Sequence, residues 1–347
     1  MSVNIGIIGF GRIGAEHAGW LAAAEGVETT TVFDPTPARR ELARSRGLKL
    51  ADSMEAIFDD TTIDAVLIAT PSAMHVEPAA ASLMAGKHVM IEKPMALNLE
   101  QAKRLAYLAA ERGRVLSVFH NRRWDIDYLT VKWAIEAGRF GKLINIESRI
   151  SQWASCVGPA AKEYRPNWRN EATFGGGGLY DWGSHLLDQM WRLLWPARPV
   201  RVFAQLRGNV WSADCDDFAR VCIDFDNGAV GLVEINTTTT RPLPRWRIDG
   251  VLGSADSPMD PFYDTQNWAK LQFLPADGSV ESRLPPAEAG LSESAIWSQF
   301  CRAVQGEGAA AVPVETVLPT MLLLDAARAS SATGTCIDVR SGCEWIY

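Results

Sequence analysis

The sequence lacks the signals of a membrane or exported protein. It contains no run of about 18 apolar residues, the length that a transmembrane helix needs. The first residues, MSVNIGIIGF, have neither a basic segment nor an apolar stretch that ends in a small-residue cleavage site. Positive charge is also scarce, since 34 Lys and Arg stand against 41 Asp and Glu. We therefore expect a cytoplasmic protein that binds neither membranes nor nucleic acid.

Patterns of metal-binding and redox-active residues are equally sparse. The six cysteines form no CxxC pair, so the sequence predicts neither a zinc knuckle nor a dithiol redox site. In a reducing compartment they are expected to be free thiols. Asp181 and His185 have a spacing that can supply two metal ligands, but no third ligand follows at a convincing distance along the chain. We expect no bound metal.

The N-terminal segment, VNIGIIGFGRIGAEHAGWLAAA, has the pattern of a dinucleotide-binding strand, glycine loop and helix. An apolar run of strand length leads into Gly9-Phe10-Gly11-Arg12-Ile13-Gly14, and apolar residues at helical spacing follow. Gly9 permits a tight turn, Gly11 lets a pyrophosphate approach the backbone, and Gly14 allows the helix to pack on the strand. The unpaired N–H groups at the start of the helix then attract phosphate.

Asp34 ends the next predicted strand, VETTTVFD, 20 residues after Gly14. That spacing is typical of the acidic residue that accepts hydrogen bonds from the adenosine ribose. A carboxylate there repels a 2′-phosphate, so we predict NAD rather than NADP as the cofactor. Arg39 and Arg40 follow closely and could counter this preference. Asp34 could also be no more than a turn residue before Pro35.

Strands and helices continue to alternate up to about residue 122. IDAVLIAT, HVMIEKP and RVLSVFHNRR read as strands, and the helices between them include one that Asn98 opens. This order predicts right-handed crossovers and a parallel Rossmann sheet over residues 1–122. Ligands bind such sheets at the carboxyl ends of the strands. The segments expected there are the Gly9 loop, Asp34, Thr70 to Ser72, Glu92 to Pro94 and His120 to Arg123.

Residues 123–347 read as a second domain of the α+β type with a large, mostly antiparallel open sheet. Runs such as LINIESRISQWA alternate apolar and polar residues, and a hairpin turn is predicted at Asp226-Asn227-Gly228. A closing helix near 315–333 is free, on sequence alone, to pack back on the first domain. The length of 347 residues also favours two domains over one. The predicted fold class is therefore α/β, with a Rossmann sheet followed by a substrate-binding and oligomerisation domain.

The segment GGGGLYDWGSHLLDQ, residues 175–189, places titratable side chains after four glycines. Asp181, His185 and Asp188 are four and three residues apart, so on a helix they lie on one face. If a nicotinamide accepts a hydride, the protein must also move a proton, and an imidazole with a pKa near 6.5 suits that role. Among the five histidines we favour His185. The others are His17, His75, His88 and His120.

Asp181 and Lys93 complete the predicted catalytic group. Asp181, one turn before His185, can orient the imidazole or bind a substrate hydroxyl, and Lys93 can stabilise a developing alkoxide. Each residue also has a plain structural interpretation. His185 could be a buried core histidine, Asp181 a helix N-cap and Lys93 a solvated lysine, while the glycine run could serve only close packing.

Over most of its length the chain resembles the Gfo/Idh/MocA family of nicotinamide-dependent sugar and inositol oxidoreductases. Six motifs occur in the family's order: GFGRIG, TPSAMH, EKPMAL, FHNRRW, RPNWR and GGGGLYDWGSHLLD. The resemblance implies a catalytic lysine at Lys93, a substrate-binding aspartate at Asp181 and a catalytic histidine at His185. It also implies that the peptide bond before Pro94 is cis. The full predicted cofactor site is Gly9, Gly11, Arg12, Ile13, Gly14, Asp34, Arg39, Thr70, Pro71, Ser72, His75, Glu92, Lys93, Asn121, Trp168 and Arg169.

The resemblance further implies a sugar or polyol substrate and a homodimer or homotetramer that pairs through the open face of the second sheet. Residues expected to bind the substrate are Lys93, Arg123, Trp153, Tyr164, Asp181 and His185, with Arg122, Trp124 and Tyr263 as further candidates for specificity. The leading hypothesis is an NAD-dependent dehydrogenase of a secondary hydroxyl. Two alternatives stay open: a sugar eliminase that recycles a tightly bound NAD, and a non-catalytic sensor of sugar or NAD.

Overall fold

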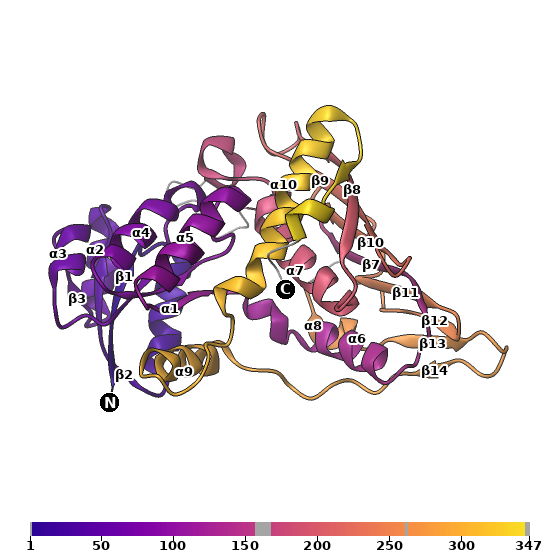
Figure 1. Cartoon of the computed structure of the whole chain (residues 1–347), viewed down its shortest axis with the longest axis horizontal. Coiled ribbons are helices and arrows are strands. Elements are labelled where there is room, and N and C mark those ends of the chain that lie inside the picture. Colours follow the sequence, from indigo (N-terminus) through magenta and orange to yellow (C-terminus); the bar gives the residue numbers. More distant parts are fainter. Residues whose placement is uncertain (1, 157–167, 261–262, 344–347) are drawn as a thin grey trace. The chain divides into compact units, whose positions relative to one another are not determined.

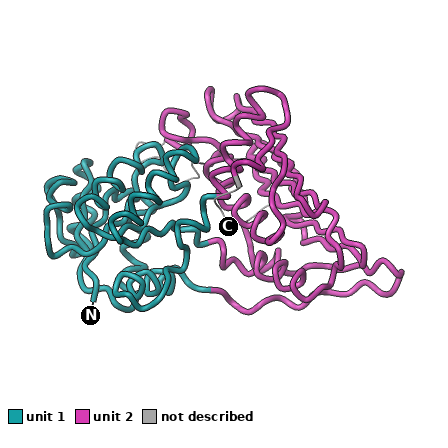
Figure 2. Tube along the Cα trace, in the orientation of Figure 1, with its two compact units in different colours: residues 1–121, 161–165, 291–318 teal, residues 122–160, 166–290, 319–347 magenta. Residues whose placement is uncertain are grey.

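The computed structural model describes residues 2–156, 168–260 and 263–343. These residues form two compact units (Figure 2). The first contains the residues up to Asn121 together with Leu291–Leu318, and the second contains those from Arg122 to Gly290 and from Pro319 onward. Residues 291–318, which the sequence pattern places in the second domain, therefore group with the first unit. Across the described ranges, no helix has the length and apolar character needed to cross a bilayer.

The first unit is built on a six-stranded parallel sheet, which confirms the predicted Rossmann fold. The strand order is β3–β2–β1–β4–β5–β6, and every neighbouring pair is parallel. The order reverses between β1 and β4, and the carboxyl ends of these two strands define the point where such sheets bind dinucleotides. The strands are β1 (Val3–Ile8), β2 (Val27–Phe33), β3 (Lys49–Leu50), β4 (Ala65–Ile68), β5 (His88–Ile91) and β6 (Leu116–Val118).

Helices bury this sheet, and all four residues of β4 are buried, as expected where both faces of a parallel strand are covered. Asn98 opens α5 as predicted, since its side chain accepts a hydrogen bond from the backbone N–H of Gln101. Helix α9, from late in the chain, packs against α1. The helices of this unit are α1 (Arg12–Ala22), α2 (Pro37–Ser45), α3 (Met54–Asp59), α4 (Val76–Met84), α5 (Leu99–Glu111) and α9 (Glu293–Val304), with short turns η1 (Ser72–Met74) and η7 (Val314–Val317).

The second unit contains a nine-stranded sheet in the order β14–β13–β12–β11–β7–β10–β9–β8–β15. Of its neighbouring pairs, β7 and β10 are parallel and the rest antiparallel, which confirms the mostly antiparallel sheet. Asp226-Asn227-Gly228 forms the predicted turn between β9 and β10. The strands are β7 (Leu143–Ser151), β8 (Pro199–Arg207), β9 (Phe218–Phe225), β10 (Val230–Asn236), β11 (Trp246–Gly250), β12 (Gly253–Asp256), β13 (Gln272–Pro275), β14 (Ser282–Arg283) and β15 (Ile337–Asp338).

Helices α6, α7 and α10 lie along one face of this sheet (Figure 1). The closing helix, α10, packs within the second unit. Its Thr320 hydroxyl accepts a hydrogen bond from the Trp191 indole at 3.1 Å, and its Ser330 hydroxyl accepts one from the Ala204 N–H at 2.9 Å. The 3-10 turn η7 just before it belongs to the first unit. The helices are α6 (Ile126–Glu136), α7 (Ser184–Leu194), α8 (Thr265–Trp268) and α10 (Leu318–Thr333).

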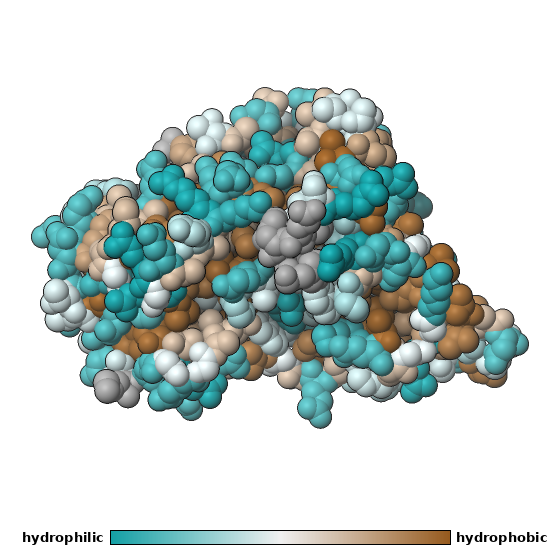
Figure 3. Space-filling view, viewed as in Figure 1, coloured by the Kyte–Doolittle hydropathy of each residue, from teal (hydrophilic) through white to brown (hydrophobic). Residues whose placement is uncertain are grey.

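The opposite face of the nine-stranded sheet is open. Along β8, Val202 and Ala204 are buried, whereas Phe203 between them is exposed, as the two-residue period of a strand requires. Exposed apolar side chains also gather where β7, β11, β12 and β13 neighbour one another, an end of the sheet that Figure 3 shows. They are Ile144, Val251, Leu252 and Leu274.

The glycine loop between β1 and α1 depends on two close backbone approaches. Gly9 has a φ of +95°, and a Cβ there would lie 2.6 Å from the carbonyl oxygen of Ala69. A Cβ on Gly14 would lie 2.1 Å from the carbonyl oxygen of Gly9. Neither neighbour is a side chain that can rotate away, so the sequence pattern and the packing impose the same two glycines.

Gly14→Ala should therefore lower the free energy of unfolding by about 1–3 kcal/mol, because helix α1 must move away from the loop. Gly19→Ala on the same helix is the matched control, since a Cβ there meets no atom within 4 Å. It should raise stability by about 0.5–1 kcal/mol through helix propensity. Denaturation followed by circular dichroism measures both, and equal effects of the two substitutions would contradict this account of the packing.

Candidate active site

The glycine loop leaves the start of α1 open toward a ligand. Gly11 is the N-cap of α1 and has no side chain to occupy the first N–H groups, and no acidic residue lies in the first turn. Arg12 is exposed and lies 3.9 Å from Glu16, one helical turn on. Free N–H groups and the positive end of the helix dipole attract a phosphate. The loop thus has the geometry and electrostatics that a pyrophosphate requires.

Asp34 lies beneath this loop and holds it. One carboxylate oxygen, Oδ2, accepts a hydrogen bond from the Phe10 N–H at 2.7 Å, and Oδ1 accepts one from the Thr36 N–H at 2.8 Å. The bond to Thr36 is the turn interaction that the sequence left open as an alternative. The bond to Phe10 adds a link, across 24 residues, to the middle of the glycine loop.

The two arginines after Asp34 have different surroundings. Arg39 lies on the glycine loop: its Nη1 is 3.4 Å from Asp34 Oδ2 and 3.7 Å from where a Cβ on Gly11 would be. Arg40 donates to the Ala51 carbonyl at 2.8 Å and pairs with Asp52 at 3.3 Å. Of the two, Arg39 is therefore the one that adds positive charge next to Asp34.

His75 connects two of the predicted cofactor segments. The ring is buried, with Nδ1 2.9 Å from the Pro94 carbonyl oxygen and Nε2 2.9 Å from the Thr70 carbonyl oxygen. Burial lowers the pKa of His75 despite these two acceptors, and a neutral imidazole donates through one nitrogen at a time. Within unit 1, the buried His75 ring thus links the turn after β4 to the loop that carries Lys93.

Glu92 and Lys93 occupy the loop after β5. The Lys93–Pro94 peptide is cis, as the family resemblance implied. Glu92 is buried; its Oε2 accepts the Lys93 backbone N–H at 3.1 Å, and its Oε1 lies 2.8 Å from His17 Nε2. Burial raises the pKa of Glu92, but the hydrogen bond from His17 and the charges nearby outweigh it, so the pKa lies below its ordinary value.

Three further predicted residues of unit 1 lie near α9 or in the turn after β4. Asn121 donates from its side-chain amide to Glu293 Oε1 at 3.3 Å, in the first turn of α9. Ser72 is buried in η1, while Thr70 donates from its hydroxyl to the Met74 carbonyl at 3.1 Å. The sequence pattern predicts the helix itself, but it did not indicate this contact, because Glu293 lies 172 residues after Asn121.

Two neighbouring groups, the Arg169 carbonyl and the Asp216 carboxylate, require glycines in the run of the second unit. A Cβ on Gly176 would lie 2.4 Å from the Arg169 carbonyl oxygen, and one on Gly177, whose φ is +105°, would lie 2.2 Å from Asp216 Oδ1. Asp216 Oδ2 accepts a hydrogen bond from the Leu179 N–H at 2.7 Å. Burial raises the pKa of Asp216 to about 6, against the backbone N–H groups that stabilise the carboxylate.

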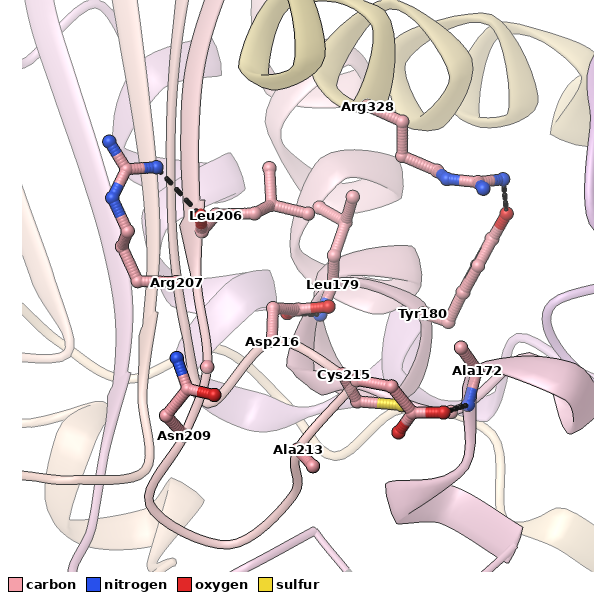
Figure 4. A pocket seen from close by; sticks show the side chains of 13 residues that line it. Ala172, Leu179, Tyr180, Leu206, Arg207, Asn209, Ala213, Cys215, Asp216 and Arg328 are labelled. Atoms are coloured by element: carbon pink, nitrogen blue, oxygen red, sulfur yellow. Dashed lines mark hydrogen bonds between the residues drawn. The ribbon is translucent and has the colours of Figure 1, made fainter.

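Asp216 also lines a cavity of about 300 Å³. In Figure 4 the Asp216 carboxylate points toward the Leu179 backbone, and the Arg328 guanidinium reaches the Tyr180 hydroxyl. Asp181 and His185 are not among the residues that line this cavity. Tyr180 therefore lines the cavity, whereas the consecutive residue Asp181 does not.

Asp181 and His185 do not lie on one continuous α-helix. Asp181 lies in a π-helical turn, η6 (Leu179–Gly183), that runs directly into α7, and His185 is the second residue of α7. Asp181 Oδ1 is 3.4 Å from Arg169 Nε, and both side chains are 17% exposed. The Arg169 guanidinium in turn lies 4.3 Å from the centre of the Trp168 ring. The structure thus brings Trp168, Arg169 and Asp181 together at the start of this segment.

Asp188 and Arg123 form a buried ion pair. Arg123 Nε and Nη2 donate to Oδ2 and Oδ1 of Asp188 at 2.8 and 2.7 Å, and both side chains are almost fully buried. The Thr320 hydroxyl of α10 donates to Asp188 Oδ1 at 3.0 Å. Asp188 lies three residues after His185 on α7, and both side chains are buried. The guanidinium of Arg123, which the sequence suggested as a substrate contact, is paired with Asp188 in this structure.

Arg122, by contrast, belongs to an aromatic cluster next to the Asp181 segment. Its guanidinium lies 4.8 Å from the Trp182 ring centre and 4.2 Å from that of Tyr263, and the two rings are stacked. Tyr263 donates to Asp125 Oδ2 at 2.5 Å. Burial raises the pKa of Asp125 to about 6 although Arg122 opposes it. Asp125 and Trp182 were missed from the sequence; the adjacency of Trp182 to Asp181 was the available signal.

Two predicted substrate contacts remain, Trp153 and Tyr164. Trp153 is exposed and meets Trp211 edge-on at 5.3 Å between ring centres. Tyr164 lies outside the described residues. Flat exposed rings suit the apolar faces of sugars, so Trp153 keeps that prediction.

Two family models match the chain. The model described as an oxidoreductase family with an NAD-binding Rossmann fold, GFO_IDH_MocA, matches residues 3–120, and the GFO/IDH/MocA C-terminal domain matches residues 128–256. The first match covers all six strands of the parallel sheet, and the second covers β7 to β12 of the nine-stranded sheet. The chain belongs to the Gfo/Idh/MocA oxidoreductase family.

The relatives include named dehydrogenases. The chain is 36% identical to the uncharacterized oxidoreductase YdgJ of Escherichia coli over 61% of this chain, and 30% identical to the scyllo-inositol 2-dehydrogenase (NADP(+)) IolW of Bacillus subtilis over 65% of it. It spans 60% of the length of each of these relatives. A solved structure of levoglucosan dehydrogenase in complex with NADH and levoglucosan superposes with a TM-score of 0.81 at 25% identity, covering 98% of this chain and all of that one.

Proposed function

We propose that this protein is an NAD-dependent dehydrogenase that oxidises a secondary hydroxyl of a sugar, an inositol or a related polyol. The observation that carries the proposal is the pairing, in one chain of this family, of an open glycine loop with an ordered Arg169–Asp181–His185 segment. A binding module needs no aligned proton acceptor. The levoglucosan and scyllo-inositol dehydrogenases among its relatives support the substrate class.

The residues of unit 1 fit a nicotinamide dinucleotide. The uncapped start of α1 suits the pyrophosphate, and any side chain at Gly9 or Gly14 would close the approach. The residues proposed to hold it are those of the Gly9–Gly14 loop, Asp34 and the segments after β4 and β5. When bound, the nicotinamide supplies the acceptor for a hydride from the substrate carbon.

The proposed roles of the chain's own residues follow from their chemistry. His185 accepts the proton of the substrate hydroxyl, and Lys93 places a positive charge beside the developing alkoxide. Asp181 orients the substrate or the imidazole. Arg169, 3.4 Å from Asp181, fixes the direction of that carboxylate. Trp182 and Arg122 offer an aromatic and a cationic surface for substrate specificity.

His185→Ala should lower kcat by a factor of about 10² to 10⁴, the range of a lost general base, in a panel of inositols, aldoses and anhydrosugars with NAD. His88→Asn is the control, because Asn keeps an acceptor for the Val115 N–H that His88 binds. Initial rates of NADH formation are the measurement. Full activity of the His185 variant would remove it from the mechanism. A new product without net NADH would favour the eliminase, and NAD binding without turnover the sensor.

The wild-type protein should prefer NAD to NADP, because the Asp34 carboxylate repels a 2′-phosphate. Asp34→Asn removes the charge and keeps one acceptor oxygen, which can take the Phe10 N–H of the loop but not also the Thr36 N–H. The ratio of kcat/KM for NADP to that for NAD should rise about tenfold, equivalent to about 1.4 kcal/mol. Arg39→Ala should move the ratio the other way, since Arg39 is the nearby cation. Equal use of both cofactors by the wild type would contradict the proposed role of Asp34.

We also propose that copies of the chain associate through the open face of the nine-stranded sheet. This face combines the exposed Phe203 and Val230 with cross-strand ion pairs such as Arg220–Glu234, a mixture typical of self-association surfaces. Sedimentation should show a dimer or tetramer that Phe203→Glu converts to smaller species. Met84→Glu, at an equally apolar exposed position on α4, is the control. A monomeric wild type would refute the proposal.

A further inference from the structure

Glu92 is a buried carboxylate whose two oxygens have different partners. Oε2 accepts the backbone N–H of Lys93, and Oε1 meets the ring of His17, which is fully buried in α1. A carboxylate in such surroundings is costly unless hydrogen bonds satisfy it. His17 therefore does more than fill space, because it provides the side-chain partner of this charge.

Trp297 settles which nitrogen of His17 carries the proton. The Trp297 indole Nε1 donates to His17 Nδ1 at 2.9 Å, across 280 residues of sequence. An indole N–H can only donate, so Nδ1 must accept and is unprotonated. The proton is then on Nε2, which points at Glu92 Oε1 at 2.8 Å. The hydrogen bonds run in one direction, from Trp297 through His17 to Glu92.

The surroundings of His17 strengthen these bonds. Its ring makes edge-to-face contacts with Trp20, Phe119 and Trp297 at centroid distances of 4.8, 4.3 and 5.6 Å. Aromatic walls on these sides exclude water, and hydrogen bonds in a low dielectric are stronger and harder to replace. The histidine is thus fixed in position, orientation and tautomer.

We propose that Trp297 and His17 are positioning residues that hold Glu92 as a carboxylate and thereby fix the backbone of Lys93. This inference rests on the proposed catalytic role of Lys93. Through it, α9 contributes to the reaction although none of its residues belongs to the glycine, EKP or Asp181 motifs. A histidine with a fixed tautomer that orients its neighbour is a familiar device for supporting catalytic groups.

The proposal predicts a specific pH effect. The titratable groups that act on Glu92 are His17 from α1, His75 ahead of α4 and Lys93 on its own loop. With His17 in place the pKa of Glu92 is lowered, so the carboxylate persists as the pH falls. Without the donor, burial dominates and the pKa rises, so Glu92 becomes protonated toward acidic pH and loses its charge.

The direct test is NMR of the full-length protein without added substrate. Side-chain ¹⁵N spectra should show His17 with Nδ1 unprotonated and Nε2 protonated, as the Trp297 bond requires. Side-chain ¹³C spectra of glutamate-labelled protein, with Glu92→Gln used to assign the Glu92 signal, should show an ionised Glu92 at neutral pH. In His17→Leu the Glu92 signal should titrate at a higher pH than in the wild type. A protonated Nδ1, or the same Glu92 titration with and without His17, would contradict the proposed hydrogen bonds from Trp297 to His17 and from His17 to Glu92.

Activity then tests the consequence for Lys93. In His17→Leu, kcat/KM should fall about 10- to 100-fold at pH 6 and recover toward wild type by pH 9, the size of loss typical when a supporting hydrogen-bond partner is removed. His17→Gln, which keeps an N–H donor, should stay within about threefold of wild type at both pH values. A loss of equal size at every pH, or no rescue by glutamine, would reduce His17 to a packing residue.

Two features keep the outcome interpretable. If His17→Leu does not fold, Trp297→Phe retains His17 but removes the indole that donates to it, and the ¹⁵N spectra should then show a population of the other tautomer. An unchanged tautomer would overturn the role of Trp297. The spectra need no substrate, so they test the hydrogen bonds of His17 separately from the reaction. If the spectra show these bonds but the protein oxidises no polyol, the proposed function is refuted and the positioning role of His17 and Trp297 on Glu92 stands.

Discussion

Three of the loops described above are held by carboxylates that accept hydrogen bonds from backbone N–H groups. Asp34 holds the glycine loop through Phe10, Glu92 holds Lys93, and Asp216 holds the end of the glycine run through Leu179. Backbone N–H groups at a tight turn have no partner within the turn, and a buried charge has no water, so each satisfies the other. Loops fixed in this way keep their shape without a ligand, which reduces the entropy lost when one binds.

This arrangement explains why glycines lie where they do. A carboxylate or carbonyl can support a loop only if it comes close to the backbone, and a Cβ on the supported residue would occupy the same space. Gly177 against Asp216 and Gly14 against the Gly9 carbonyl are examples, one in each unit. The glycine run before Asp181 therefore supports the π-helical turn that contains Asp181. The same close packing against Asp216 also fixes where this turn begins.

Charged groups divide into those that hold the fold and those left at the surface of a site. Arg123 and Asp188 form a buried ion pair with two hydrogen bonds, and the buried Asp127 accepts a hydrogen bond from the Trp246 indole. Asp181 and Arg169 are partly exposed, and Lys93 is half-buried. The exposed atoms of these partly exposed groups can exchange hydrogen bonds with a bound molecule. A levoglucosan dehydrogenase shares the fold and a scyllo-inositol 2-dehydrogenase is a relative, but a shared fold does not by itself fix a substrate.

The sequence by itself determined what depends on local stereochemistry. The glycine loop, the Asn98 cap, the turn at Asp226-Asn227-Gly228 and the two sheet types follow from spacing, turn residues and periodicity, all of which act over a few residues. Tertiary structure decided which polar side chains are consumed by pairing. Arg123 pairs with Asp188, Arg39 and not Arg40 faces the glycine loop, and Trp297 sets the tautomer of His17. These partners lie 5 to 280 residues apart. Burial of a charge is stable only with a partner, and that partner is chosen by packing rather than by the local sequence.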